Sequence, residues 1–283
     1  MSVPVPTISN VPNLSGNKSV CREERPVDRL PNYLPSAWKM PLPELPSPMA
    51  RLACRGLIGG WGGRIQSIVG LANAGLDRDP FIVALNHSQR TEALLIPAVL
   101  AALRRGRLVH FMADWNFLLL PIVGTVIRLS KPITVVRKDL KPRWLNFLKP
   151  RFASGSQPFE EAAAILRSGR SIGVFPEGTV NRHRTQLLRG LSGAARLSVE
   201  TGIPILPVGI RFTAGGNETW ISDREHFSIH FGQPLSPGFP EASPSNARVG
   251  AWHAEVMQAI ACLSGKNWSP NNPRIKYASN SPS

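Results

Sequence analysis

The strongest constraint on the fold of this chain is an alternation of strand and helix patterns through its middle. Short apolar runs with β-branched members predict buried strands, and stretches with helix start and stop signals predict helices between them. The predicted strands are residues 80–85, 108–112, 133–136, 171–175, 204–212 and 227–231, and the predicted helices are residues 91–105, 158–168 and 193–201. We therefore expect an α/β fold with a mixed, largely parallel sheet flanked by helices.

Composition marks the ends of this region. Ten of the 27 prolines lie in residues 1–50, where apolar periodicity is weak, so this stretch is predicted to be a mostly disordered arm. Residues 264–283 are polar and rich in Pro, Asn and Ser, which predicts a disordered tail. The expected domain covers residues 51–263.

The charge balance is strongly basic, with 33 Lys and Arg against 18 Asp and Glu, a formal net charge of +15. Such a charge favours nucleic acid, an anionic bilayer surface or a phosphorylated small molecule as a partner. The first 20 residues lack a secretory signal pattern. The longest charge-free apolar run, residues 115–127, has 13 residues, fewer than the roughly 20 that span a bilayer. We expect a cytoplasmic protein that associates peripherally with membranes.

Two segments are candidates for membrane docking. Residues 137–151 combine basic residues with apolar side chains such as Trp144 and Phe147, which suits an anionic leaflet. Residues 56–76 are the second candidate, although their glycines make a poor isolated helix. A basic nucleic-acid-binding protein is the alternative from a different class. No helix-turn-helix, zinc-finger or RNP pattern accompanies the charge, so nucleic acid is not the expected partner.

A histidine and an acid follow the predicted strand at residues 80–85. In parallel sheets, functional residues gather in the loops at the carboxyl ends of strands. His87 lies in such a loop, and Glu92 comes five positions later, about one turn into the next helix. Imidazole paired with carboxylate is the minimal general-base unit. The alternative is a solvated histidine beside a glutamate that only stabilises the helix N-terminus.

A second polar loop, residues 175–182, follows the predicted strand at 171–175. Gly178 and Thr179 lie in a turn that exposes backbone N–H groups, and the Arg182 guanidinium is suited to a phosphate. The alternative is an ordinary Pro-Glu-Gly turn with a basic face.

Together the two loops resemble the glycerolipid acyltransferase superfamily, the PlsC-like group that includes 1-acyl-glycerol-3-phosphate acyltransferases. The first loop has Asn-His, four residues and an acid, and Phe-Pro-Glu-Gly-Thr follows about 85 residues later. Two weaker blocks are in the right order, at residues 132–137 and at residues 193–208. The resemblance covers roughly residues 80–235.

The resemblance implies acyl transfer from acyl-CoA or acyl carrier protein to the hydroxyl of a lysophospholipid, first of all 1-acyl-glycerol 3-phosphate, giving phosphatidate. It implies that His87 is the general base and that Glu92 holds it. The residues implied to bind the acceptor phosphate are Arg137, Glu177, Gly178, Thr179 and Arg182. It implies no cofactor, no metal and no covalent enzyme intermediate.

Two positions depart from the family pattern. The usual acid of the first block is Asp, and Glu92 is one methylene longer. The third block commonly continues with Arg-Ser-Arg, whereas this chain has Val180 and Asn181 before Arg182. Glycerol 3-phosphate and a lyso-ornithine lipid therefore stay open as acceptors. His226 and His230 are four residues apart, but no third ligand of matching spacing accompanies them, so a metal site is not expected.

Overall fold

The computed structural model describes residues 41–45, 47–119, 121–136, 146–147, 157–213 and 219–274. Its α-helices are α1 (Pro48–Trp61), α2 (Glu92–Leu103), α3 (Pro121–Leu129), α5 (Pro158–Arg167), α6 (Gly193–Thr201) and α7 (Asn246–Ser264). Its strands are β1 (Ile65–Val69), β2 (Ile82–Leu85), β3 (His110–Asp114), β4 (Ile133–Val135), β5 (Ile172–Val174), β6 (Ile205–Phe212) and β7 (Phe227–Phe231). Short 3-10 helices are η2 (Gly62–Arg64), η3 (Leu71–Ala74), η4 (Leu76–Arg78) and η5 (Trp115–Leu119).

The described strands form one seven-stranded sheet in the order β1-β7-β6-β2-β5-β3-β4. Neighbouring strands are parallel, except that β6 and β7 are antiparallel. This confirms the expected mixed, largely parallel sheet. The predicted strands lie where the sequence patterns placed them, although β2 and β3 each begin two residues later than predicted, and β1 was not predicted.

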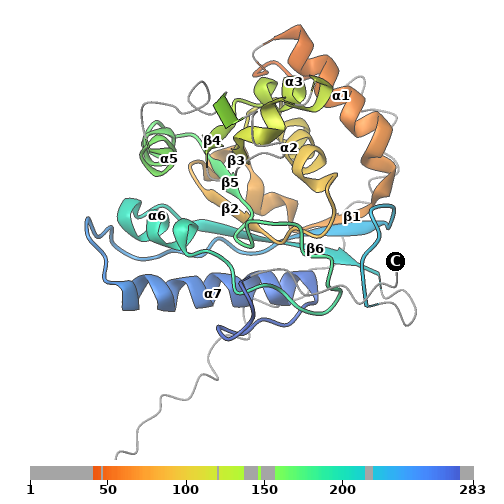
Figure 1. The fold of residues 1–283 in the computed structure, drawn as a ribbon. Coiled ribbons are helices and arrows are strands. Elements are labelled where there is room, and N and C mark those ends of the chain that lie inside the picture. The colour runs from red at the N-terminus through yellow and green to blue at the C-terminus, as the bar shows by residue number, and fades with distance from the viewer. Residues whose placement is uncertain are drawn as a thin grey trace, which may run out of the picture.

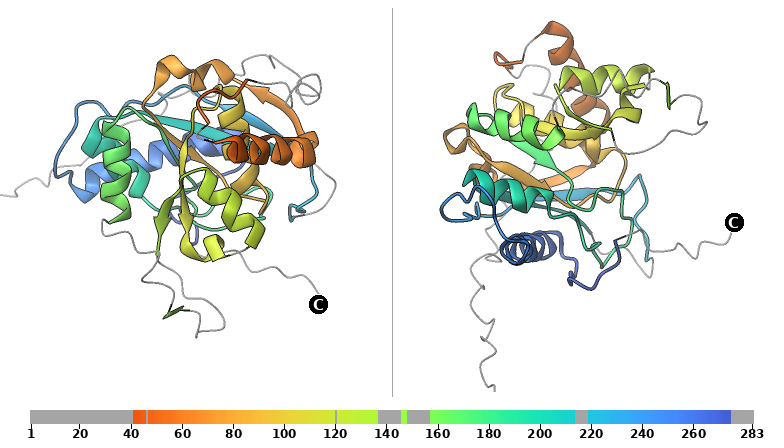
Figure 2. Two further views of the ribbon diagram at one scale, coloured as in Figure 1. Left: turned by 90° about the horizontal axis from the view of Figure 1, so that it is seen from above. Right: turned by 60° about the vertical axis from the view of Figure 1, so that its left-hand side comes forward.

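Helices cover both faces of the sheet, with α1, α2 and α3 on one side and α6 and α7 on the other (Figure 1; Figure 2 gives two further views). The central strand β2 explains this arrangement. Val83 and Leu85 belong to a core shared with α1 and α2, whereas Ile82 and Ala84 belong to a core shared with α5, α6 and α7. A strand buried on both faces is apolar without interruption, as the sequence of β2 is.

The N-terminal part of the domain begins earlier than the composition indicated. Leu42, Leu45 and Ala50 are buried, so the prediction of a disordered arm is wrong for residues 42–45 and 47–50, while residues 1–40 and 46 lie outside the described part. Helix α1 starts where the Ser47 hydroxyl accepts the Ala50 N–H at 3.1 Å. Its buried side chains pack on α2, which stabilises a helix that its glycines would disfavour in isolation. Residues 56–76 thus form the end of α1, three 3-10 turns and β1 rather than one docking helix.

The C-terminal boundary also differs from the prediction. Helix α7 lies so close to β6 that a Cβ at Gly209 would come within 2.2 Å of the Leu263 carbonyl carbon, so this position needs glycine. Beyond the helix, the Asn267 N–H donates to the Thr185 carbonyl at 2.8 Å, and the Leu187 N–H donates to the Asn267 carbonyl at 3.0 Å. The prediction of a disordered tail is wrong for residues 264–274, because these contacts hold them on the loop after β5. Residues 275–283 lie outside the described part.

A buried ion cluster closes the other end of β2, away from the two polar loops. The carboxylate of Asp79 is 4% exposed and pairs with Arg104, which is 1% exposed, and with Arg107 Nε at 2.8 Å. The Ser171 hydroxyl also donates to Asp79. This cluster ties the end of α2 to the segments that precede β2 and β5.

Candidate active site

The two polar loops meet because β2 and β5 are parallel neighbours, which puts their carboxyl ends at the same edge of the sheet. The Asn181 N–H donates to the main-chain carbonyl of His87 at 2.7 Å. The His87 N–H in turn donates to the Glu177 carboxylate at 3.2 Å. The backbone of His87 is therefore held on both sides by the loop after β5.

His87 and Glu92 form a buried pair. The distance between His87 Nδ1 and Glu92 Oε2 is 2.9 Å, and the side chains are 12% and 0% exposed. The Ser88 N–H donates to the same Glu92 oxygen at 2.7 Å. A carboxylate at Nδ1 holds the imidazole with a proton on that nitrogen, which leaves Nε2 free to accept a proton. The longer side chain of Glu92 thus reaches the histidine from the first residue of α2.

Aromatic contacts set the plane of the imidazole. The centroid of the His87 ring lies 4.3 Å from that of Phe175, with 32° between the ring planes. Phe175 in turn lies 5.6 Å from Phe111 of β3. The ring of His87 therefore has one apolar neighbour and one charged partner.

Asn86 anchors the start of the first loop. Its side-chain amide donates to the Ile210 carbonyl at 3.0 Å, and its side-chain oxygen accepts the Ile210 N–H at 2.7 Å. These bonds replace the main-chain pairing with β6 just beyond the end of β2. Asn86 is the first residue of the Asn-His motif, and an asparagine directly after a buried strand is a signal for such anchoring.

Glu177 points into the protein. It is 4% exposed, and its Oε2 accepts the Asn181 side-chain amide at 2.7 Å and the Leu188 N–H at 2.8 Å. Burial raises the pKa of this carboxyl group above its ordinary value. The carboxylate is surrounded by donors of the protein, so it organises the loop. The resemblance implied that Glu177 helps to bind the acceptor phosphate, whereas its carboxylate points inward to these donors.

The remaining predicted phosphate ligands are placed differently. Gly178 adopts a left-handed conformation (φ 64°), which closes a turn with its N–H donating to the Phe175 carbonyl at 2.9 Å. Gly178 and Thr179 are half-buried at this turn. Arg137 lies outside the described residues.

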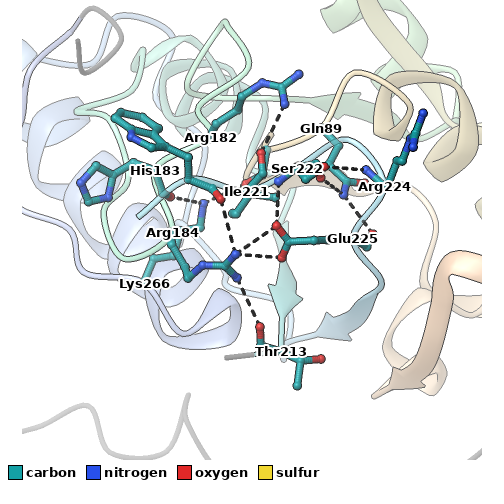
Figure 3. A network of polar contacts seen from close by, with 12 residues as sticks. Gln89, Arg182, His183, Arg184, Thr213, Ile221, Ser222, Arg224, Glu225 and Lys266 are labelled. Carbon is teal, nitrogen blue, oxygen red and sulfur yellow. Dashed lines mark hydrogen bonds and ion pairs between the residues drawn. The ribbon is translucent and has the colours of Figure 1, made fainter. Parts of the chain in front are cut away.

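The Arg182 guanidinium pairs with the Asp223 carboxylate and donates to the Ile221 carbonyl at 3.2 Å (Figure 3). Burial raises the pKa of Asp223, but the hydrogen bonds from the Arg182 side chain and the Arg90 N–H, together with the charges of both arginines, hold that pKa below the ordinary value. At 33% exposure, the Arg182 side chain remains accessible.

The segment at residues 219–225, which the sequence analysis missed, is bound to both loops. The Gln89 side-chain amide donates to the Ser222 carbonyl at 2.7 Å. Arg184 donates to both carboxylate oxygens of Glu225, at 3.0 and 2.9 Å (Figure 3). These residues carry no motif, and only the folded chain brings them to the site.

The described residues also bear on metal binding and on membrane crossing. No group of three or more His, Cys, Asp or Glu side chains there is arranged to hold a metal ion, and His226 and His230 belong to none. Among the helices of the same residues, none has the length and apolar character needed to cross a bilayer.

The parallel sheet and the His–Glu pair at its edge are features of an acyltransferase. A family model described as Acyltransferase matches residues 69–211, half of the chain and both polar loops. The chain belongs to this acyltransferase family, which confirms the resemblance seen in the sequence.

Proteins that resemble the chain include a curated enzyme and a solved structure. The 1-acyl-sn-glycerol-3-phosphate acyltransferase of Borreliella burgdorferi is 32% identical over 98 residues, 34% of this chain and 34% of that protein. The matched region thus spans about a third of the length of that curated relative. The crystal structure of the 1-acyl-sn-glycerophosphate acyltransferase PlsC from Thermotoga maritima aligns with a TM-score of 0.48 at 22% identity, over 83% of this chain and 81% of that chain.

Proposed function

We propose that this protein transfers a fatty acyl group from an acyl thioester to the free hydroxyl of 1-acyl-glycerol 3-phosphate, giving phosphatidate. The observation that carries this proposal is the His87–Glu92 pair, buried and 2.9 Å apart, at the carboxyl end of β2. The name of the Borreliella burgdorferi relative supports this choice of acceptor.

In the proposed reaction, His87 Nε2 takes the proton of the acceptor hydroxyl while the hydroxyl oxygen attacks the thioester carbonyl. Glu92 accepts the Nδ1–H and stabilises the imidazolium that forms. When the tetrahedral intermediate collapses, the carbon–sulfur bond breaks and the imidazolium gives its proton to the departing thiolate, which leaves as the thiol. Atoms and charges balance without a metal, a cofactor or an acyl-enzyme.

The acceptor phosphate is assigned to the turn after β5. Gly178 shapes this turn through its left-handed conformation, the half-buried Thr179 offers its main-chain N–H and hydroxyl, and Arg182 offers its guanidinium. A guanidinium has five N–H donors, so bonds to Asp223 and Ile221 leave others for a phosphate. Arg137 is proposed as a further ligand from the sequence alone. Glu177 takes the role of holding this turn against His87.

The donor is proposed to be acyl-CoA or acyl carrier protein, and the protein is proposed to act in the cytoplasm on an anionic membrane surface. The net charge of +15 supports this attachment. So do the apolar side chains that α1 exposes, since Met49 and Leu52 are 61% and 58% exposed.

The test is an assay of the purified full chain with radiolabelled acyl-CoA and acyl carrier protein against lysophosphatidate, glycerol 3-phosphate and a lyso-ornithine lipid. We expect label in phosphatidate, and labelling that is about 10²- to 10⁴-fold slower in the same assay with His87→Ala. If only glycerol 3-phosphate or the lyso-ornithine lipid is labelled, the protein is still an acyltransferase, but lysophosphatidate is not its acceptor. No acyl transfer to any of them would overturn the proposal.

A further inference from the structure

We propose that Lys266 is a positioning residue of this site, which joins the loops after β2 and β5 and supplies the positive charge that their buried carboxylates face. The inference rests on the proposed function for its kinetic consequences. Lys266 lies outside the family match at residues 69–211 and beyond the last predicted strand.

The contacts of Lys266 are specific. The residue is 5% exposed, and its ammonium donates to Ser88 Oγ at 2.8 Å and to the His183 carbonyl at 2.9 Å. Ser88 follows β2 and His183 follows β5. The Ser88 N–H donates to the Glu92 oxygen that also meets His87 Nδ1. A chain of polar contacts therefore runs from Lys266 through Ser88 and Glu92 to His87.

The fold delivers Lys266 to this place through the end of α7. Gly265 ends the helix in a left-handed conformation (φ 69°), and the Lys266 N–H donates to the Ala261 carbonyl at 2.9 Å. The close approach of α7 to Gly209 fixes the end of the helix against β6. Lys266 is thus held by main-chain contacts on both sides, since Asn267 pairs with Thr185 and Leu187.

The charges around Lys266 explain why a buried ammonium is tolerated. Burial lowers its pKa, the carboxylates of Glu177 and Glu92 raise it, and Arg184 lowers it. In return, Lys266 opposes the effect of burial, which raises the pKa of Glu177. Two buried carboxylates contact His87, Glu92 at the imidazole and Glu177 at the main-chain N–H, and the charge of Lys266 acts on both of them. A buried ion that loses its partner is costly, so Lys266 is replaced by side chains of similar length.

Glu177 links this charge to catalysis. It accepts three N–H groups, from His87, Asn181 and Leu188, and an ionised carboxylate offers them more acceptor sites than a protonated carboxyl group does. Without Lys266, the pKa of Glu177 rises further, so Glu177 takes up a proton at a higher pH. The backbone of His87 then loses a contact that sets its position.

The experiment compares three variants of the full chain. Lys266→Met removes the charge and both hydrogen bonds, and Lys266→Gln keeps a donor but removes the charge. Trp268→Phe is the matched control, because it removes one hydrogen bond (to the Arg189 carbonyl, 3.1 Å) from the same segment without touching the site. We expect Lys266→Met to lower kcat about 10- to 100-fold, with KM for both substrates little changed, because the base is misplaced.

The pH profile separates a positioning role from a merely structural one. In both Lys266 variants the acid limb of the kcat/KM profile moves to higher pH, whereas Trp268→Phe keeps the wild-type profile. Activity lost only in proportion to folded protein, with the wild-type profile, would overturn the proposal. If Lys266→Met does not fold, the pH profile of Lys266→Gln alone tests the proposal.

A second readout does not depend on the reaction. Hydrogen–deuterium exchange of peptides that contain the Ser88 amide is expected to be faster in Lys266→Met and unchanged in Trp268→Phe. Wild-type protein that shows no acyl transfer would contradict the proposed function but not this link. Unchanged exchange in Lys266→Met would contradict the link itself.

Discussion

The main-chain N–H of Asn181 donates to the main-chain carbonyl of His87 at 2.7 Å, which couples two loops that lie far apart in the sequence. Because Asn181 also bonds Glu177 through its side chain, the position of the imidazole depends on the conformation of the second loop. Substitutions in either loop are therefore expected to act on the same step.

The general base is tested by His87→Ala. We expect kcat to fall by about 10²- to 10⁴-fold, the usual contribution of a positioned base, with an unchanged circular dichroism spectrum. His226→Ala is the control, because His226 is exposed and makes no contact with this pair. Acyl transfer at the wild-type rate by His87→Ala would exclude His87 as the base.

The length of the acid is tested by Glu92→Asp. Asp is usual at this position in the family, but here the carboxylate oxygen meets both His87 Nδ1 and the Ser88 N–H from the first residue of α2. Shortening the side chain withdraws it from both donors, so we expect kcat to fall about tenfold, equivalent to roughly 1.4 kcal/mol. Steady-state kinetics with saturating acyl donor measure this, and equal activity would mean that α2 can shift to restore the contact.

Phosphate recognition is tested by Arg182→Ala in neutral detergent micelles, which remove any effect of bilayer charge. Loss of a charge-assisted hydrogen bond of roughly 1.5–3 kcal/mol predicts a decrease of about one to two orders of magnitude in kcat/KM for a phosphorylated acceptor. The acyl-donor constant is expected to change little. Asp223→Asn serves as the companion, because it weakens the same ion pair but keeps the arginine. Similar losses in both variants would assign Arg182 to holding the segment at 219–225 instead.

The buried ion cluster is tested by Arg104→Leu. Removal of Arg104 leaves the buried Asp79 carboxylate with the partly exposed Arg107 as its charged partner, so we expect a loss of about 3 kcal/mol in the free energy of unfolding. Urea denaturation measures it. The double variant Asp79→Asn/Arg104→Leu is expected to lose less than the sum of the single variants, because the charges disappear together. Additive losses would show that the two side chains are not coupled.

Acid sensitivity is tested at His110. Burial lowers its pKa, although the hydrogen bond to the Lys131 carbonyl (2.9 Å) raises it. The unfolded chain then binds more protons just below the ordinary histidine pKa of about 6.5, so stability falls as the pH decreases from there toward the lowered folded-state pKa. His110→Asn keeps a donor but does not titrate. The midpoint of urea denaturation at several pH values is expected to depend less on pH in this variant.

The sequence by itself determined the parts of this protein that local patterns specify. The apolar run of β2 required burial on both faces, and the five-residue spacing of His87 and Glu92 brought them together, because a loop and one helical turn leave few arrangements for the pair. The glycine after Glu177 predicted a turn. Each of these depends on contacts between residues close in the chain.

The tertiary structure decided what depends on distant segments. Nothing in the local sequence of Glu177 indicates that Asn181, Leu188 and His87 surround its carboxylate. The partner of Arg182 follows from the path of the chain before β7, and the burial of Lys266 follows from the packing of α7 on β6 at Gly209. From the sequence alone, charged side chains in loops such as Arg182 and Lys266 are expected to be exposed to solvent. Whether they are paired and buried is set by the packing of the whole sheet and its helices.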